Sequence, residues 1–427
     1  MDVLVVGSGG REHALGWKLR QSPRCGRLLA APGNPGLAAV GTCLPIGADD
    51  ADALVQLAME ERVGLVVVGP EAPLAAGLAD RLRSAGIPVF GPSAAAARIE
   101  SSKAFARDLM TRMGIPQPEY AVFTHGGEAQ SYLVGLAARG VTSVVVKASG
   151  LAAGKGAVVC ETIAAAQQVT RAMLDEGAFG DAGREVVIEE RLVGPEASLL
   201  VVTDGYVVVP CLPAQDYKRI GEEDTGPNTG GMGSYAPAPL VSGEVYAEAL
   251  TTIVRPALRA LAEAGTPFVG CLYAGLMLTA AGLKVIEFNC RFGDPETQAV
   301  LSLLDSDLLE LLLAAAEGRL AASDTHWRPE KAVCVALVSA GYPGRYDTGM
   351  PITGLEEAQV LPGVTIFHAG TRRASDGALV TAGGRVLNVV GTGSSFACAM
   401  DRAYAAADCI RFAGKTLRRD IGLRVRE

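Results

Sequence analysis

Several features of specialised proteins are missing from this 427-residue sequence. No apolar run approaches the roughly 18 residues of a membrane-spanning helix, and even the stretch 308–316 is interrupted by Glu310. The nine cysteines include no Cys-x-x-Cys pair and the four histidines are scattered, which argues against a disulfide framework and a zinc site. Met1-Asp2 leads directly into an apolar strand without a basic segment or cleavage site, so we expect a cytoplasmic protein.

Basic segments are missing as well. The net charge is −8, lysine occurs at only eight positions, and no block of lysine or arginine stands out. This pattern disfavours nucleic acid as a partner but is compatible with a local cationic pocket for small anions. We therefore expect small-molecule substrates, no nucleic acid and no membrane. The length itself predicts two to four packed units.

The N-terminal part has the pattern of an open parallel sheet. Short apolar runs at 2–7, 64–69 and 87–91 each end in glycine, and helical stretches separate them. Ligands of such sheets gather beyond the carboxyl ends of the strands. The loops expected there are polar or rich in glycine, at 9–12, 32–35, 69–73 and 91–93.

A nicotinamide-binding fold is a possible reading of this part, because Gly7-Ser-Gly9 follows a strand. The third glycine of that fingerprint would fall at Glu12, and the second strand ends without an acidic residue to hold a ribose. A nicotinamide oxidoreductase is therefore a weak alternative. The motif is also compatible with a structural turn that binds no ligand.

A glycine-rich loop lies between two β-branched runs at 144–160. Gly150, Gly154 and Gly156 would let backbone N–H groups approach phosphate oxygens, and Lys147 and Lys155 would add positive charge. A Walker loop runs from a strand into a helix, whereas a second strand follows here. The pattern predicts a flap between two strands, and the alternative is an ordinary hairpin with an exposed lysine.

Glu287, Asn289 and Arg291 stand two residues apart at the end of another strand-like run. A two-residue period places all three side chains on one face, where oxygen ligands beside a fixed cation suit Mg²⁺ shared with a phosphate. The alternative is a polar sheet face with a surface ion pair. Asp294-Pro295 then predicts the start of one long helix over 296–317, and the strand-rich stretch after a linker at 323–329 predicts a small α+β cap.

Four strings together carry a resemblance to a known family: Gly-Leu-Ala-Ala-Gly-Lys-Gly at 150–156, Val-Ile-Glu-Glu at 187–190, the segment 224–233 and Arg-Phe-Gly-Asp-Pro-Glu-Thr-Gln at 291–298. They resemble the phosphoribosylamine–glycine ligases, the ATP-grasp enzymes of purine biosynthesis also called glycinamide ribonucleotide synthetases. The similarity runs from Gly7 to Gly422. It implies an N-terminal open α/β domain that binds phosphoribosylamine (1–102), an ATP-grasp region (103–325) with a flap subdomain at about 120–192, and a C-terminal α+β domain (326–427).

The resemblance also implies roles for individual residues. ATP would be bound by Lys103, Lys147, Gly150, Gly154, Lys155, Gly156, Glu189, Glu190, Leu192 and Glu196. Mg²⁺ or Mn²⁺ would be held by Glu287 and Asn289, while Gly275–Thr279 offers no carboxylate for a second metal. Glycine would be bound by Asp216, Lys218 and Arg291, and 5-phosphoribosylamine by Gly9, Gly10, Asn34, Glu71 and Ser93. Catalysis itself is expected to depend on Arg291, Lys147 and Lys155.

Some of these roles have plain structural alternatives. Glu189 and Glu190 would otherwise be a solvated strand end, Ser93 a helix cap and Glu71 a surface acid. Tyr217 stands where the family usually has a histidine, and the sequence assigns no role to this position.

The expected chemistry is the ligation of glycine to 5-phosphoribosylamine through a glycyl phosphate, with release of ADP and phosphate. Such a reaction needs neutralised phosphates, positioning and exclusion of water but no enzyme nucleophile, and the sequence has no Gly-x-Ser-x-Gly elbow. Alternatives are an ATP-grasp ligase with a different acid or amine and a nucleotide-binding regulator without catalysis. The protein is expected to be a monomer or a small homo-oligomer.

Overall fold

The computed structural model describes residues 1–152, 155–321 and 325–426. The N-terminal part is a five-stranded sheet in the order β3-β2-β1-β4-β5, in which all neighbouring strands run parallel. Its strands are β1 (Val3–Gly7), β2 (Leu28–Pro32), β3 (Thr42–Cys43), β4 (Leu65–Val68) and β5 (Val89–Phe90). The helices are α1 (Gly10–Leu19), α2 (Leu37–Val40), α3 (Ala51–Glu60), α4 (Glu71–Ala75), α5 (Leu78–Ser84) and α6 (Ala94–Ser101). The predicted open parallel sheet is thus confirmed.

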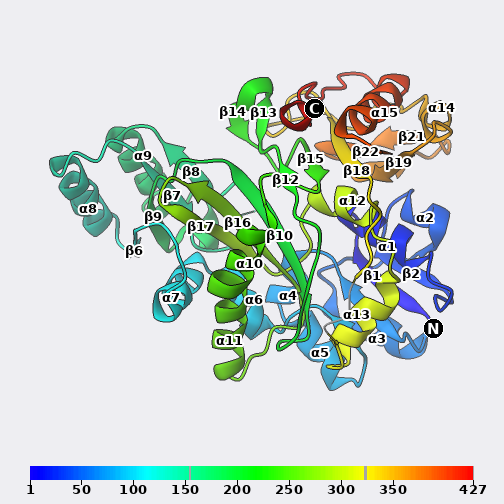
Figure 1. Ribbon diagram of the computed structural model, residues 1–427, viewed down its shortest axis with the longest axis horizontal. Helices are drawn as coiled ribbons and strands as arrows, with labels where there is room; N and C mark the ends of the chain where they lie inside the picture. The colour runs from blue at the N-terminus through cyan, green and yellow to red at the C-terminus, as the bar shows by residue number, and fades with distance from the viewer. Residues whose placement is uncertain (153–154, 322–324, 427) are drawn as a thin grey trace.

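A four-stranded antiparallel sheet carries the glycine-rich loop and lies at one end of the molecule (Figure 1). Its order is β6 (Tyr120–Phe123), β9 (Val186–Glu190), β7 (Val144–Ala148) and β8 (Ala157–Cys160), with helices α8 (Gly126–Ala138) and α9 (Ile163–Leu174) packed against it. Strands β7 and β8 pair directly, so the loop between them is the hairpin that the sequence predicted.

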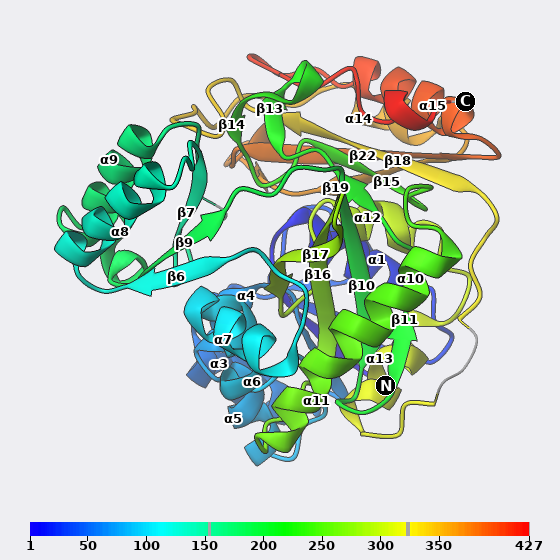
Figure 2. The same cartoon turned by 60° about the vertical axis from the view of Figure 1, so that its left-hand side comes forward.

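A second four-stranded sheet forms the middle of the molecule (Figure 2). Its order is β11 (Val208–Pro210), β10 (Glu196–Thr203), β16 (Gly270–Thr279) and β17 (Gly282–Asn289). The helical elements near it are α7 (Lys103–Met113), α10 (Gly243–Ala249), the π-helical turn η3 (Leu250–Val254) and α11 (Arg255–Glu263). Strand β17 carries the predicted metal ligands, Glu287 and Asn289, so this sheet positions that part of the site.

The C-terminal sheet takes two strands from the middle of the chain. Its order is β12 (Gln215–Asp216), β15 (Gly233–Ala236), β18 (Lys331–Val338), β22 (Arg385–Gly393) and β19 (Val364–His368), covered by α14 (Leu355–Gln359) and α15 (Phe396–Cys409). Two hairpins stand beside it, β13 (Arg219–Gly221) with β14 (Thr225–Asn228) and β20 (Thr371–Arg373) with β21 (Leu379–Thr381). The segment 215–236 is therefore fixed by the C-terminal part of the chain.

The single helix predicted over 296–317 is wrong. The structure has two helices there, α12 (Glu296–Leu301) and α13 (Leu308–Ala316). Asp307 begins the second one, since its Oδ1 accepts hydrogen bonds from the backbone N–H of Leu309 at 2.9 Å and of Glu310 at 3.3 Å. Such a side-chain cap favours a new helix start over continuation of the old one.

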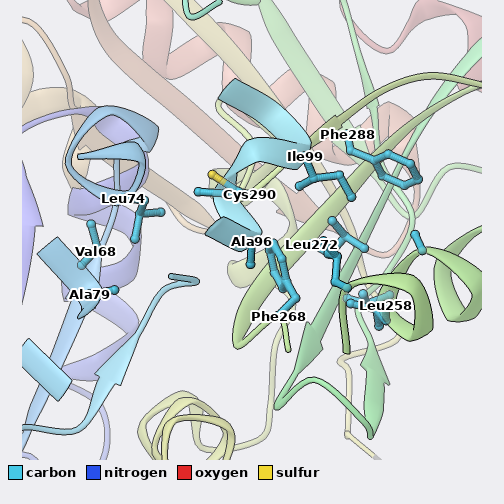
Figure 3. Packing of buried hydrophobic residues seen from close by; sticks show 14 of the residues in the cluster. Val68, Leu74, Ala79, Ala96, Ile99, Leu258, Phe268, Leu272, Phe288 and Cys290 are labelled. Atoms are coloured by element: carbon cyan, nitrogen blue, oxygen red, sulfur yellow. The ribbon is translucent and has the colours of Figure 1, made fainter. Parts of the chain in front are cut away.

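A shared apolar core joins the N-terminal sheet to the central sheet. Figure 3 shows Leu74 and Ile99 on the N-terminal side and Phe268, Leu272 and Phe288 on the central side of one cluster. All five side chains are at most 3% exposed. Burial of apolar area on this scale holds α6, and with it the N-terminal sheet, against β17. Among the described residues, no helix is long and apolar enough to cross a membrane.

Candidate active site

A cavity of about 400 Å³ lies where the N-terminal part, the flap sheet and the central sheet meet. Its wall combines Glu71 of the N-terminal part with residues of the flap sheet, of the segment 216–230 and of the stretch 286–296. Predicted site residues that line it are Glu71, Lys103, Lys147, Gly156, Glu189, Glu190, Leu192, Glu196, Asp216, Lys218, Glu287, Asn289 and Arg291. The flap strands and the end of β17 therefore face one space.

The carboxylate of Glu287 and the amide of Asn289 are available for a ligand. Within the described part of the chain, neither side chain has a hydrogen-bond or ion-pair partner, although both line the cavity. Burial alone would raise the pKa of Glu287, but the charges of Lys218, Lys147 and Lys103 outweigh it and hold that pKa below its ordinary value. Gly275 pairs with Glu287 across the strands. The site thus offers two oxygen ligands, which suits Mg²⁺ completed by phosphate and water.

Lys147 is held in place by a buried ion-pair triad. Its Nζ lies 2.8 Å from Oε2 of Glu189 and donates to the carbonyl of Ile286 at 3.0 Å. Arg107 binds the same carboxylate with two nitrogens, at 2.7 and 2.8 Å. The three side chains are at most 5% exposed. Both oxygens of Glu189 are therefore already bound, and the carboxylate positions Lys147.

The other residues expected to bind the nucleotide are held by single ion pairs or only line the cavity. Glu190 is exposed and pairs with Lys284 at 3.0 Å, and Leu192 lines the cavity next to it. Glu196 pairs with Lys218 at 2.9 Å. The residues expected for ribose and for glycine thus contact each other directly.

The predicted residues of the flap and the neighbouring Lys103 differ in their contacts and in whether they line the cavity. Lys103 donates from its backbone N–H to the carbonyl of Ser149 at 2.9 Å, and its Nζ lies 3.5 Å from the carbonyl of Gly150. Gly150 approaches residue 182 so closely that an added Cβ would lie 2.7 Å from the Cα of Ala182. Lys155 is exposed and does not line the cavity, and Gly154 lies outside the described residues.

Arg291 is fixed by two carboxylates of the N-terminal part. Its Nε lies 3.1 Å from Oε2 of Glu71 and its Nη2 lies 3.2 Å from Oε1 of Glu100. Glu100 also accepts a hydrogen bond from the backbone N–H of Cys290 at 2.7 Å. The carboxylates of Glu100 and Glu71 outweigh the effect of burial and raise the pKa of Arg291. Residues expected for two different substrates, Glu71 and Arg291, therefore form one ion pair.

Four residues expected to bind phosphoribosylamine lie away from the cavity wall: Gly9, Gly10, Asn34 and Ser93. The amide of Asn34 donates to the carbonyls of Ser8 and His368, each at 2.9 Å, and its oxygen accepts from the N–H of Gly36 and Leu37. It joins the N-terminal loop to the C-terminal sheet.

Ser93 accepts from the N–H of Ala96 at 3.2 Å and is the helix cap that was its alternative. The N–H of Gly9 donates to Oε2 of Glu12 at 2.6 Å. A Cβ at Gly7 would lie 2.6 Å from the Glu12 side chain, so that carboxylate fills the turn where a dinucleotide would need free backbone. This supports the rejection of the nicotinamide fold.

Asp216 and Lys218 line the cavity, while Tyr217 between them points the other way. The side chain of Tyr217 is 1% exposed, and its hydroxyl accepts from the N–H of Gly422 at 3.0 Å. The guanidinium of Arg418 stacks over its ring at 4.8 Å. Tyr217 thus packs against the C-terminal segment, which is a structural position.

Burial raises the pKa of Asp216 to about 8, with the charges of Glu296, Glu196 and Glu287 adding to the effect while Lys218 opposes it. For Lys218 the neighbouring Glu196 and Asp216 outweigh burial and raise its pKa well above the ordinary value. The cavity therefore has an acidic end near Asp216, in contrast to the cationic surroundings of Glu287.

Sequence reasoning missed several residues of the wall, notably Glu100, Arg107, Tyr273, Asp294 and Glu296. Three of them carried a usable signal. Arg107 follows Lys103 by four residues on one helix, which places both on one face, and Asp294 and Glu296 belong to the string 291–298. Glu100 and Tyr273 stand in plain helix and strand patterns that gave no signal.

Comparisons with known proteins agree along the whole chain. Models of the phosphoribosylglycinamide synthetase N domain, ATP-grasp (A) domain and C domain match residues 1–100, 101–297 and 332–424. The chain is 49% identical over 427 residues to the phosphoribosylamine–glycine ligase of Brucella melitensis biotype 1, covering 100% of this chain and 99% of that one. It is 50% identical over 429 residues to the protein of that name from a Nostoc species, covering 100% of both.

The fold agrees as well. A crystal structure of phosphoribosylamine–glycine ligase from Thermotoga maritima is similar with a TM-score of 0.84 and 31% identity, over 99% of this chain and 100% of that one. The resemblance seen in the sequence is thus confirmed by matches to all three domain models and by relatives that cover the full length. The chain belongs to the phosphoribosylglycinamide synthetase family of ATP-grasp enzymes, whose members are also named phosphoribosylamine–glycine ligases.

Proposed function

We propose that this enzyme uses ATP to join glycine to 5-phosphoribosylamine, through a glycyl phosphate, and releases glycinamide ribonucleotide, ADP and phosphate. The observation that carries the proposal is the position of Glu287 and Asn289, which have no side-chain partner among the described residues, on the same cavity wall as Lys103, Lys147 and Arg291. Acidic and amide oxygens beside several cations match the needs of a transferred phosphoryl group. The names of the full-length relatives support the choice of substrates.

The nucleotide would lie between the flap sheet and β17. Lys147, pinned by Glu189 and Arg107, would meet the phosphates at a fixed position, and Lys103 would add a second cation. Glu190, Leu192 and Glu196 stand on the same side for the base and ribose. Because its carboxylate is already bound twice, Glu189 serves the nucleotide through Lys147 rather than by direct contact. Gly150, Gly154, Lys155 and Gly156 would cover the phosphates.

The donor set fits a divalent cation. Glu287 and Asn289 would hold Mg²⁺ or Mn²⁺, which would offset the negative charge of the terminal phosphates when bound. The two side chains have no competing partner among the described residues, and the neighbouring lysines keep the carboxyl of Glu287 ionised. The opposing strand has glycine at position 275, so it adds no side-chain ligand opposite Glu287.

Glycine and phosphoribosylamine would meet at Arg291. The guanidinium would receive the carboxylate of glycine, and Asp216 with Lys218 would flank the rest of the molecule. Glu71, the residue of the N-terminal loops that reaches the wall, would face the amine of phosphoribosylamine. Gly9, Gly10, Asn34 and Ser93 would shape the neighbouring loops. The limits 1–102, 103–325 and 326–427 for the three domains also stay a proposal.

The test is ADP release by the purified full-length protein with ATP, Mg²⁺, glycine and 5-phosphoribosylamine generated in the assay. Release that requires both glycine and the amine supports the proposal. Release with a different acid or amine only would favour another ATP-grasp ligase, and ATP binding without turnover would favour a regulator. A change in nicotinamide absorbance would revive the oxidoreductase alternative.

A further inference from the structure

A buried carboxylate with two hydroxyl partners lies at the acidic end of the cavity. Glu296, the first residue of α12, lines the cavity although it is only 3% exposed. Its Oε1 accepts from the hydroxyl of Tyr273 at 3.0 Å and from the hydroxyl of Ser198 at 3.1 Å. The two hydroxyl oxygens are 2.8 Å apart. Two hydroxyls, one from β10 and one from β16, thus fix the carboxylate of α12 in one orientation.

The backbone around Glu296 is built to admit this side chain. A Cβ added at Gly293 would lie 2.6 Å from Oε2 of Glu296 and 3.1 Å from the ring of Tyr273. Any residue larger than glycine would therefore push the carboxylate aside. Oε1 is occupied by the hydroxyls, which leaves Oε2 on the side of Gly293 and the cavity.

The charges at this end do not balance. Glu196 and Asp216 stand near Lys218, which is paired with Glu196 at 2.9 Å, and Glu296 stands near Asp216. The two cations nearest Glu296, Arg291 and Arg385, are already paired with other carboxylates: Glu71, Glu100 and Asp294. In the described part of the chain, neither Asp216 nor Glu296 forms an ion pair.

An unbalanced pair of carboxylates in a cavity favours a cationic ligand. The divalent cation of the proposed function is assigned to Glu287 and Asn289, and no group of three or more histidine, cysteine, aspartate or glutamate side chains among the described residues marks a second metal site here. A primary ammonium group carries three N–H donors on one charge and matches oxygen acceptors on two sides. Burial and the neighbouring acids raise the pKa of Asp216 to about 8, and an ammonium group bound beside this carboxyl would lower that pKa.

We propose that Glu296, oriented by Tyr273 and Ser198, binds the ammonium group of the amino-acid substrate together with Asp216. This inference rests on the proposed function and adds to it a substrate-binding residue that sequence reasoning missed. The amino acid would be held with its carboxylate toward Arg291 and its ammonium toward Glu296. An acid that has no amine would be held by the first contact alone.

The test compares Glu296→Gln with the unchanged enzyme and with Glu310→Gln, a control on the surface of α13. Glutamine keeps the shape and removes the charge, so KM for glycine should rise roughly 10- to 100-fold, the usual effect of losing a charged hydrogen bond. KM for ATP and kcat should change by less than about 3-fold, and Glu310→Gln should match the unchanged enzyme. Inhibition by acetate, a carboxylate without an amine, should stay the same in Glu296→Gln.

A milder variant keeps the test decisive if Glu296→Gln does not fold. Tyr273→Phe removes one hydroxyl and should raise KM for glycine about 3- to 10-fold with little change for ATP. An unchanged KM for glycine in the folded variants, or a loss confined to kcat, would overturn the proposal. If the unchanged enzyme shows no glycine-dependent ADP release, the proposed function fails instead, and the two failures are therefore distinct.

Discussion

Replacing Glu189 by alanine would leave two buried cations without their shared anion. Arg107 and Lys147 are at most 5% exposed on their side chains and lie 2.7 and 2.8 Å from the carboxylate. Removing one partner of a buried ion pair costs about 3–5 kcal/mol, because the remaining charge stays desolvated. For a unit of about 150–250 residues, this corresponds to a fall in Tm of roughly 6–20 °C.

The assay is calorimetric or circular-dichroism melting of the ligand-free enzyme at pH 7.5. Glu190→Ala is the matched control, since the next residue on the same strand pairs with Lys284 at the surface with side-chain exposures of 43% and 23%. An exposed pair contributes at most about 1 kcal/mol, so this variant should melt within a few degrees of the unchanged enzyme.

The pH dependence of this stabilisation follows from the direction in which the pKa of Glu189 is shifted. Burial would raise the pKa of Glu189, but Lys147 and Arg107 outweigh it and lower that pKa below its ordinary 4.5. A carboxyl with a depressed folded-state pKa stabilises the protein above pH 4.5, and that contribution is lost as the pH falls through the folded-state value. The difference in Tm between the unchanged enzyme and Glu189→Ala should therefore become smaller below about pH 4.

Equal melting of the Glu189 and Glu190 variants would refute the reasoning, because it would mean that the carboxylate does not stabilise buried cations. A variant that keeps its Tm but loses ATP affinity would instead assign Glu189 to the nucleotide directly.

Three further predictions concern the cavity and the joint between the N- and C-terminal parts. Glu287→Ala should stay folded and lose at least about 100-fold in kcat, and near-normal rates at saturating Mg²⁺ would remove Glu287 from the mechanism. Asp216→Asn should raise Tm at pH 8 more than at pH 5, because a carboxyl with a folded-state pKa of about 8 releases its proton on unfolding and loses stability as the pH rises toward 8. A pH-independent difference in melting would contradict that pKa. Burial lowers the pKa of His13 to about 3 and that of His368 to about 4. Stability should therefore fall as the pH drops from about 6.5 to 4, and His13→Asn should flatten this slope in a melting series.

Much of the fold could be predicted because its signals are local. The parallel sheet followed from apolar runs that end in glycine, and the flap from two β-branched runs around Gly150 and Gly156. The long helix over 296–317 failed because the cap at Asp307 outweighed the helical pattern on either side. A competing cap of this kind depends on a single side chain, which a periodicity argument averages out.

The site likewise has some features that follow from the local sequence and others that depend on packing. The sequence determined by itself that Glu287 and Asn289 share one face, because a strand alternates its side chains every two residues whatever surrounds it, whereas Arg291 lies beyond the end of β17. Only the tertiary structure decided which charges meet. Glu189 binds Arg107, 82 residues away, and Arg291 binds Glu71, 220 residues away. Backbone geometry is set by neighbours in the chain, whereas an ion pair forms between whichever buried charges packing brings within reach.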